Sequence, residues 1–140
     1  MNKSLDRFLI AQQQYFRTAL EEIKNGRKQS HWMWYIFPQI QGLGMSAISQ
    51  EYAIKDMQEA RDYLADFTLR NNLIDISEAL LRNESNDARE IMGFPDDMKL
   101  RSSMTLFALA DNKCEVFQKV LDKFFDGKMD DKTIRILNSL

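Results

Sequence analysis

Turn-forming residues are scarce in this chain: glycine occurs 5 times and proline 2 times in 140 residues. A fold built from many short strands needs a tight turn between consecutive strands, and glycine and proline supply many of those turns. The scarcity therefore favours helices. A chain of this length is also the usual size of a single domain, so we expect one helical domain over residues 1–140.

The charges of the chain nearly cancel, because 19 basic and 21 acidic residues leave a formal net charge of −2. No net positive field attracts a polyanion, and nucleic acid is therefore not an expected partner. The single cysteine, Cys114, has no second cysteine to pair with, and the start of the chain lacks the apolar stretch of a signal peptide. The longest apolar run, residues 32–37, is far shorter than the ~20 residues of a membrane-spanning helix. We expect a cytoplasmic protein without a membrane span.

Apolar residues recur at steps of three and four along most of the chain, which places them on one side of amphipathic helices. This spacing predicts helices over residues 5–25, 53–65, 68–83 and 113–126. A further helix is expected over residues 96–109, because Pro95 suits a first helical turn, Asp96 and Asp97 complement its positive end, and residues 111–112 break it. Shorter helical segments are expected at residues 46–52, 87–92 and 131–137. The fold class is therefore all-α, with about seven to eight helices, and it is not a simple four-helix bundle.

Side chains that can cap these helices precede most of them, because a serine or aspartate oxygen accepts hydrogen bonds from the free amides of a first helical turn. The predicted caps are Ser4, Ser46, Ser85 and either Asp130 or Asp131. The apolar block at residues 31–37 fits a buried strand as well as a buried helix. We interpret it as a helix, because Ser30 can cap it, Pro38 can end it, and no second strand is evident.

Two segments, residues 26–44 and 93–107, do not divide into a core face and a solvent face. Each mixes polar groups with large rings or methionines, so some of these polar groups must be buried with partners or exposed for use. We therefore expect any functional site in these two segments.

His31 is the only histidine, and its side chain is the only one whose ordinary pKa lies near neutrality, so it is the candidate catalytic acid or base. The alternative is that His31 lies at a helix start and bonds a neighbouring backbone group. One histidine and one cysteine do not form a metal site, since zinc usually takes three or four nitrogen and sulfur ligands. We predict no metal and no cofactor. Free cysteines are usually small core side chains, and we expect this of Cys114.

The aromatic side chains of Trp32 and Trp34 are candidates for stacking on a planar ligand, with packing in the core as the alternative. In the second segment, Lys99 and Arg101 are candidates for holding a phosphate or carboxylate. The hydroxyls of Ser102 and Ser103 would add hydrogen bonds. An ordinary ion pair between Asp97 and Arg101, four residues apart on a helix, explains the same charges without a ligand.

The strings SHWMWYIFPQIQGLG at residues 30–44 and GFPDDMKLRSSMTLF at residues 93–107 resemble the two signatures of domain of unknown function 1810, a bacterial and fungal family. The ending FQKVLDKFFDGKMDDKTIRIL is similar to the tail of that family, so the resemblance covers nearly the whole chain. It implies an unusual all-helical globule and no known reaction. Some members carry a label that refers to calpastatin, but calpastatin segments are disordered, whereas this composition should fold.

One departure from the family bears on mechanism. Where relatives read a histidine and a proline followed by Leu-Gly and Arg-Leu, this chain has DFTLRNNL at residues 66–73. The resemblance therefore supplies no second histidine, and His31 would have to act alone.

These observations support three hypotheses. In the first, the two segments form a pocket for a small anionic or nucleotide-like ligand. In the second, the chain is a protein-interaction module whose aromatic rings form a contact surface. In the third, both segments serve only the core. Burial of the rings distinguishes a concave pocket from a flat exposed patch.

Overall fold

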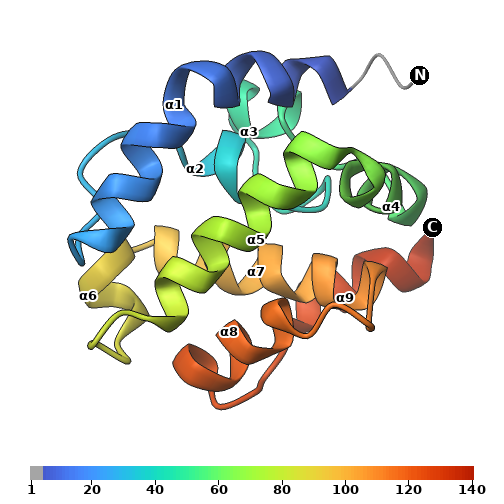
Figure 1. Cartoon of the computed structure of the whole chain (residues 1–140). Coiled ribbons are helices and arrows are strands. Elements are labelled where there is room, and N and C mark those ends of the chain that lie inside the picture. Colours follow the sequence, from blue (N-terminus) through green and yellow to red (C-terminus); the bar gives the residue numbers. More distant parts are fainter. Residues whose placement is uncertain (1–4) are drawn as a thin grey trace.

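The computed structural model describes residues 5–140, and that part of the chain contains nine α-helices and no β-strand (Figure 1). They are α1 (Asp6–Lys24), α2 (Met33–Ile36), α3 (Ala47–Glu51), α4 (Met57–Ala65), α5 (Phe67–Leu81), α6 (Ala88–Met92), α7 (Asp96–Ala110), α8 (Val116–Phe125) and α9 (Asp131–Ser139). The all-α prediction is confirmed. The count exceeds eight because α2, α3 and α6 are separate helices of four or five residues.

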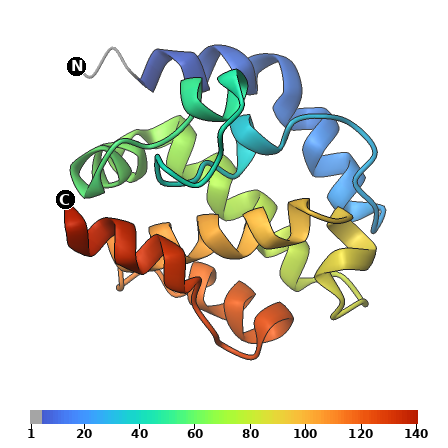
Figure 2. The same cartoon turned by 180° about the vertical axis from the view of Figure 1, so that it is seen from behind.

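Helices α5 and α7 lie at the centre of the molecule. Helix α5 packs against α1, α4 and α8, whereas α7 packs against α4, α6, α8 and α9. Figure 1 shows α5 crossing the molecule between α1 and α8, and Figure 2 shows α9 lying along α7 on the opposite face. Partners on several sides of each central helix make this arrangement different from a four-helix bundle.

Burial around α7 explains why residues 93–107 show no amphipathic stripe. Seven consecutive residues, 102–108, are buried, so this part of the helix is enclosed on every side. A helix enclosed in this way needs no polar face. By contrast, α8 buries one stripe made of Phe117, Val120 and Leu121.

Short polar side chains cap five of the helices. The predicted cap Ser46 is confirmed, since its hydroxyl accepts from the amide of Ser49 at 3.2 Å, and Asp130 caps α9 through the amide of Thr133 at 2.9 Å. The prediction of Ser85 is wrong, because the Asp87 carboxylate accepts from the first-turn amides of α6. Asp56 and Asp66 cap α4 and α5 in the same manner. The predicted cap Ser4 lies outside the described residues.

The prediction for residues 31–37 needs correction. Only Met33–Ile36 are helical, and Ser30 does not cap them because its hydroxyl donates to the Glu22 carboxylate. The segment leaves the helix at Phe37, before Pro38.

The predicted helices at residues 53–65 and 113–126 start later than expected. Helix α4 begins at Met57, because Ile54 forms an isolated parallel bridge with Ile40 and exchanges backbone hydrogen bonds with Gln39 and Gln41 at 2.8 and 2.7 Å. Helix α8 begins at Val116, after a turn in which the amide of Cys114 donates to the Asp111 carbonyl at 3.2 Å. Cys114 is partly buried against the core.

Candidate binding site

The two segments of mixed polarity, residues 26–44 and 93–107, meet at the carboxylate of Asp96, the first residue of α7. One oxygen of Asp96 lies 2.8 Å from the Lys28 ammonium, and the other lies 3.1 Å from the Lys99 ammonium. Each lysine also lies over an indole ring, with Lys28 4.9 Å from the centroid of Trp32 and Lys99 4.7 Å from the centroid of Trp34. The ion pairs and cation–π contacts therefore join the start of α7 to the tryptophan segment.

Trp32 belongs to the core. Its side chain is completely buried, and its indole N–H donates to the Glu22 carboxylate at 3.0 Å. The same carboxylate accepts from the Ser30 hydroxyl and from the amides of Gln29 and Ser30. Partial burial by itself would raise the pKa of Glu22, but these hydrogen bonds outweigh it and lower the pKa to about 2. Trp32 is thus a core residue whose N–H has an acceptor inside the protein.

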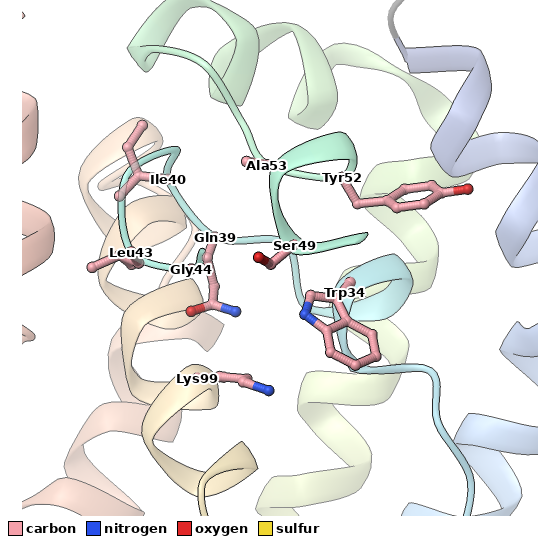
Figure 3. Close-up of a pocket in the computed structure, with 9 residues that line it drawn as sticks. All are labelled: Trp34, Gln39, Ile40, Leu43, Gly44, Ser49, Tyr52, Ala53 and Lys99. Atoms are coloured by element: carbon pink, nitrogen blue, oxygen red, sulfur yellow. The ribbon is translucent and has the colours of Figure 1, made fainter. Parts of the chain in front are cut away.

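Trp34 instead lines a cavity of about 120 Å³ between α2, α3 and α7 (Figure 3). Its other polar lining residues are Gln39, Ser49 and Lys99. In Figure 3 the indole nitrogen, the Gln39 amide, the Ser49 hydroxyl and the Lys99 ammonium surround one space. Among the described residues that line this cavity, none is acidic.

Two of these polar groups have no partner within residues 5–140. Neither the Trp34 indole nor the Gln39 amide forms a side-chain hydrogen bond there, whereas the Ser49 hydroxyl donates to the Ser46 carbonyl at 2.9 Å. Lys99 is paired with Asp96, yet Asp96 also pairs with Lys28, so two ammonium groups share one carboxylate. The site therefore presents unpaired N–H donors and a net positive charge.

The remaining wall of the cavity is apolar. Ile40, Leu43, Tyr52 and Ala53 line it together with Gly44. The bridge between Ile40 and Ile54 holds the loop of residues 39–44 in place.

Gly44 allows this loop to lie directly against α3. A Cβ atom on Gly44 would lie 2.5 Å from the Ser49 hydroxyl oxygen and 2.6 Å from the Ser49 Cβ. A side chain at this position would therefore force α3 and the loop apart. The shape of the cavity depends on this close approach.

The structure places the other predicted site residues away from this cavity. His31 is exposed and has no side-chain hydrogen bond to any described residue. The Arg101 guanidinium donates to the carbonyls of Lys128 and Met129 at 2.9 and 2.8 Å, so it ties α7 to the segment before α9.

The two predicted serines are buried within α7. Ser102 donates to the Met98 carbonyl at 3.2 Å, the bond of a helical serine to the preceding turn. Ser103 is fully buried, and its hydroxyl has no partner among the described residues. Neither residue lines the cavity. Of the predicted site residues, the structure brings only Trp34 and Lys99 together there.

Sequence reasoning did not single out Gln39 or Ser49 as lining residues of the cavity, nor Lys28 as the second lysine that pairs with Asp96. Gln39 and Lys28 lie within residues 26–44, but no motif marks them. Ser49 joins the cavity only because α3 folds back over the loop of residues 39–44. The sequence carries no signal for these residues, because the local spacing of residue types does not reveal which loop packs on which helix.

No three histidine, cysteine, aspartate or glutamate side chains in residues 5–140 gather closely enough to hold a metal ion. None of the helices in that range is both long and apolar enough to cross a bilayer.

Comparison with known proteins identifies relatives of this chain. The crystal structure of the conserved hypothetical protein Rv1873 from Mycobacterium tuberculosis is similar, with a TM-score of 0.93, 40% sequence identity and coverage of 96% of both chains. Curated proteins yield no match. The model of a family described as "Protein of unknown function (DUF1810)" matches residues 2–137. The chain therefore belongs to the DUF1810 family.

Proposed function

We propose that this protein binds a small organic anion in the cavity between Trp34 and Lys99. The observation that carries the proposal is the meeting of two unpaired donors from residues 26–44, the Trp34 indole and the Gln39 amide, with the Lys99 ammonium from residues 93–107. A carboxylate accepts hydrogen bonds at both oxygens and is stabilised by a nearby ammonium. No acidic side chain lines the described cavity, and the negative charge of Asp96, the partner of Lys99, is shared with Lys28.

The size of the cavity limits the ligand. Sites for drug-sized ligands usually measure about 300–1,000 Å³, and an engineered cavity of ~150 Å³ holds one benzene molecule. A cavity of about 120 Å³ therefore suits a compact acid with at most one ring and is too small for a whole nucleotide. The apolar wall formed by Ile40, Leu43 and Ala53 suits a hydrocarbon body behind the charged group.

The burial of the rings supports a pocket over a contact surface. Trp32 is completely buried and Trp34 is partly buried in a concave site, so the two rings do not form the flat exposed patch of an interaction module. The complete burial of Trp32 supports the core hypothesis for that ring, and the position of Trp34 beside the cavity supports the pocket hypothesis. No reaction is proposed, since His31 does not line the cavity.

The proposal is tested by titrating the protein with carboxylates from acetate to benzoate and with the matching neutral amides, followed by NMR and calorimetry. We expect at least one acid to bind about tenfold more tightly than its amide, because the amide lacks the charge that Lys99 stabilises. The amide signals of residues 39–44 and 49–53 should shift.

Two lysine variants provide the matched comparison. Lys99→Met should weaken binding of the acid by about tenfold. Lys119→Met removes the same charge from an exposed site on α8 and should leave binding unchanged. Equal effects of the two variants, or no shift in the cavity residues with any acid, would refute the proposal.

A further inference from the structure

A second, larger cavity lies between the end of α1 and α6, two segments that lie side by side in both Figure 1 and Figure 2. Its volume is about 520 Å³, and it is lined by three cationic side chains, one acidic side chain and two glycines: Arg27, Lys28, Arg89, Glu90, Gly26 and Gly93. We call it the basic cleft. It shares none of its lining residues with the cavity at Trp34.

Backbone contacts fix the two sides of the basic cleft relative to each other. The amide of Lys28 donates to the Ile91 carbonyl at 2.7 Å, which joins the segment after α1 to α6. The side-chain amide of Asn83 donates to the Ile23 carbonyl at 3.0 Å, which holds the end of α1 to the segment after α5. The cationic residues therefore stand on a fixed backbone.

The charges in the basic cleft are only partly neutralised. Lys28 is paired with Asp96, but Arg27 and Arg89 are exposed and form no ion pair with any described residue. The Arg89 guanidinium lies 4.8 Å from the ring centroid of Phe94, a stacking contact that restricts its orientation. A local positive charge is notable in a chain whose net charge is −2.

The glycines leave the basic cleft open. Gly93 ends α6 with φ 79° and ψ 167°, a backbone conformation that is essentially restricted to glycine. A Cβ atom placed there would meet no atom within 4 Å, so the backbone at this point faces free space. The main chain at Gly93 is therefore accessible to a ligand in the basic cleft.

We propose that the basic cleft binds the phosphate group of a small phosphorylated molecule through Arg27 and Arg89. The planar guanidinium fork matches phosphate oxygens in pairs, and two such forks around one concave site favour a dianion over a single negative charge. The volume of the basic cleft admits a ligand larger than the one proposed for the cavity at Trp34. The two proposals are independent.

Inorganic pyrophosphate is the probe, titrated at constant ionic strength and followed by NMR. We expect the amide signals of Gly26 and Gly93 to shift with saturation, while added NaCl leaves them in place. Arg27→Gln and Arg89→Gln should each weaken binding about threefold to fivefold, the range of an exposed ion pair. Glu90→Gln should strengthen binding, because it removes the only acidic group among the described lining residues.

Two controls separate a built site from general attraction of anions. Arg61→Gln removes an equal charge from an exposed position on α4 and should leave pyrophosphate binding unchanged. Trp34→Leu should also leave it unchanged, even if it abolishes binding of organic acids. Equal weakening by Arg61→Gln and Arg89→Gln, or the absence of saturating shifts at Gly26 and Gly93, would overturn the proposal.

Discussion

Trp32 and Trp34 stand two residues apart, yet the molecule uses them in opposite ways. Trp32 is completely buried, and its N–H donates to Glu22. Trp34 is partly exposed, and its N–H has no partner among the described residues. Both rings carry a lysine ammonium over one face, and both lysines pair with Asp96.

This comparison shows that a shared contact does not mean a shared role. The ammonium over each ring makes the same kind of favourable contact. The difference lies in the indole N–H, since a buried donor must find an acceptor inside the protein, whereas a donor in an open cavity remains available to a ligand. Satisfaction of the polar group therefore distinguishes the structural ring from the candidate binding ring.

The largest expected difference is in stability after removal of each ring. Trp32→Ala should lower the free energy of unfolding by about 4 kcal/mol, because it leaves a large void in a close-packed core. Trp34→Ala should lower it by about 1 kcal/mol, since the ring is only partly buried. Chemical denaturation of the two variants measures both values. Equal losses would remove the distinction between the two rings.

Replacement of Glu22, the hydrogen-bond partner of Trp32, should give the next largest loss of stability. Glu22→Gln should lower the free energy of unfolding at pH 7 by about 1–2 kcal/mol, since charge-assisted hydrogen bonds from Ser30, Gln29 and Trp32 are weakened. No corresponding carboxylate lines the described cavity at Trp34. The Glu22→Gln variant should therefore leave binding of organic acids unchanged.

The same carboxylate makes stability depend on pH. The pKa of Glu22 is about 2 in the folded protein and 4.5 in its ordinary state, so its contribution is present above pH 4.5 and is lost as pH falls toward 2. Denaturation between pH 6 and pH 2 should show a smaller decline for Glu22→Gln than for the wild type. Parallel curves for the two proteins would contradict this account.

Replacement of Lys28 or Lys99 should give the smallest change in stability. The Lys28 side chain is 7% exposed and also donates to the Ser30 carbonyl at 2.6 Å, whereas the Lys99 side chain is 26% exposed. Lys28→Met should cost about 1 kcal/mol of stability, and Lys99→Met about 0.5 kcal/mol or less. Thermal denaturation of the two variants shows which of them loses more stability. A larger loss for Lys99→Met would mean that Lys99 serves the fold more than the cavity.

Much of the helical architecture was predictable because it depends on local chemistry. The apolar periodicity located α1 and α5 to within a few residues, and Pro95 with the two aspartates after it located the start of α7. The cap at Ser46, and the choice of Asp130 or Asp131 for α9, followed from similarly local rules. The errors occur where tertiary contacts replaced local ones. Ser30 donates to Glu22 instead of capping a helix, and Ile54 pairs with the loop at Ile40 instead of starting α4.

The candidate site was predictable only in part. The sequence pointed to the two segments that contain Trp34 and Lys99, because their mixed polarity did not fit an amphipathic helix. It grouped Lys99 with Arg101, although the two side chains leave α7 toward different neighbours. Residues two apart on a helix point about 200° apart, so closeness in sequence did not mean a shared site.

The sequence by itself determined the helical class and the location of most helices, because scarce turn-formers, apolar periodicity and capping side chains act within a few residues of each other. Only the tertiary structure decided which tryptophan is buried, which lysine faces the cavity and which arginines remain unpaired. Those outcomes depend on contacts between residues far apart in the chain, such as Glu22 with Trp32 and Lys28 with Asp96. A large buried polar side chain such as the Trp32 indole depends on a partner that only the packed fold supplies.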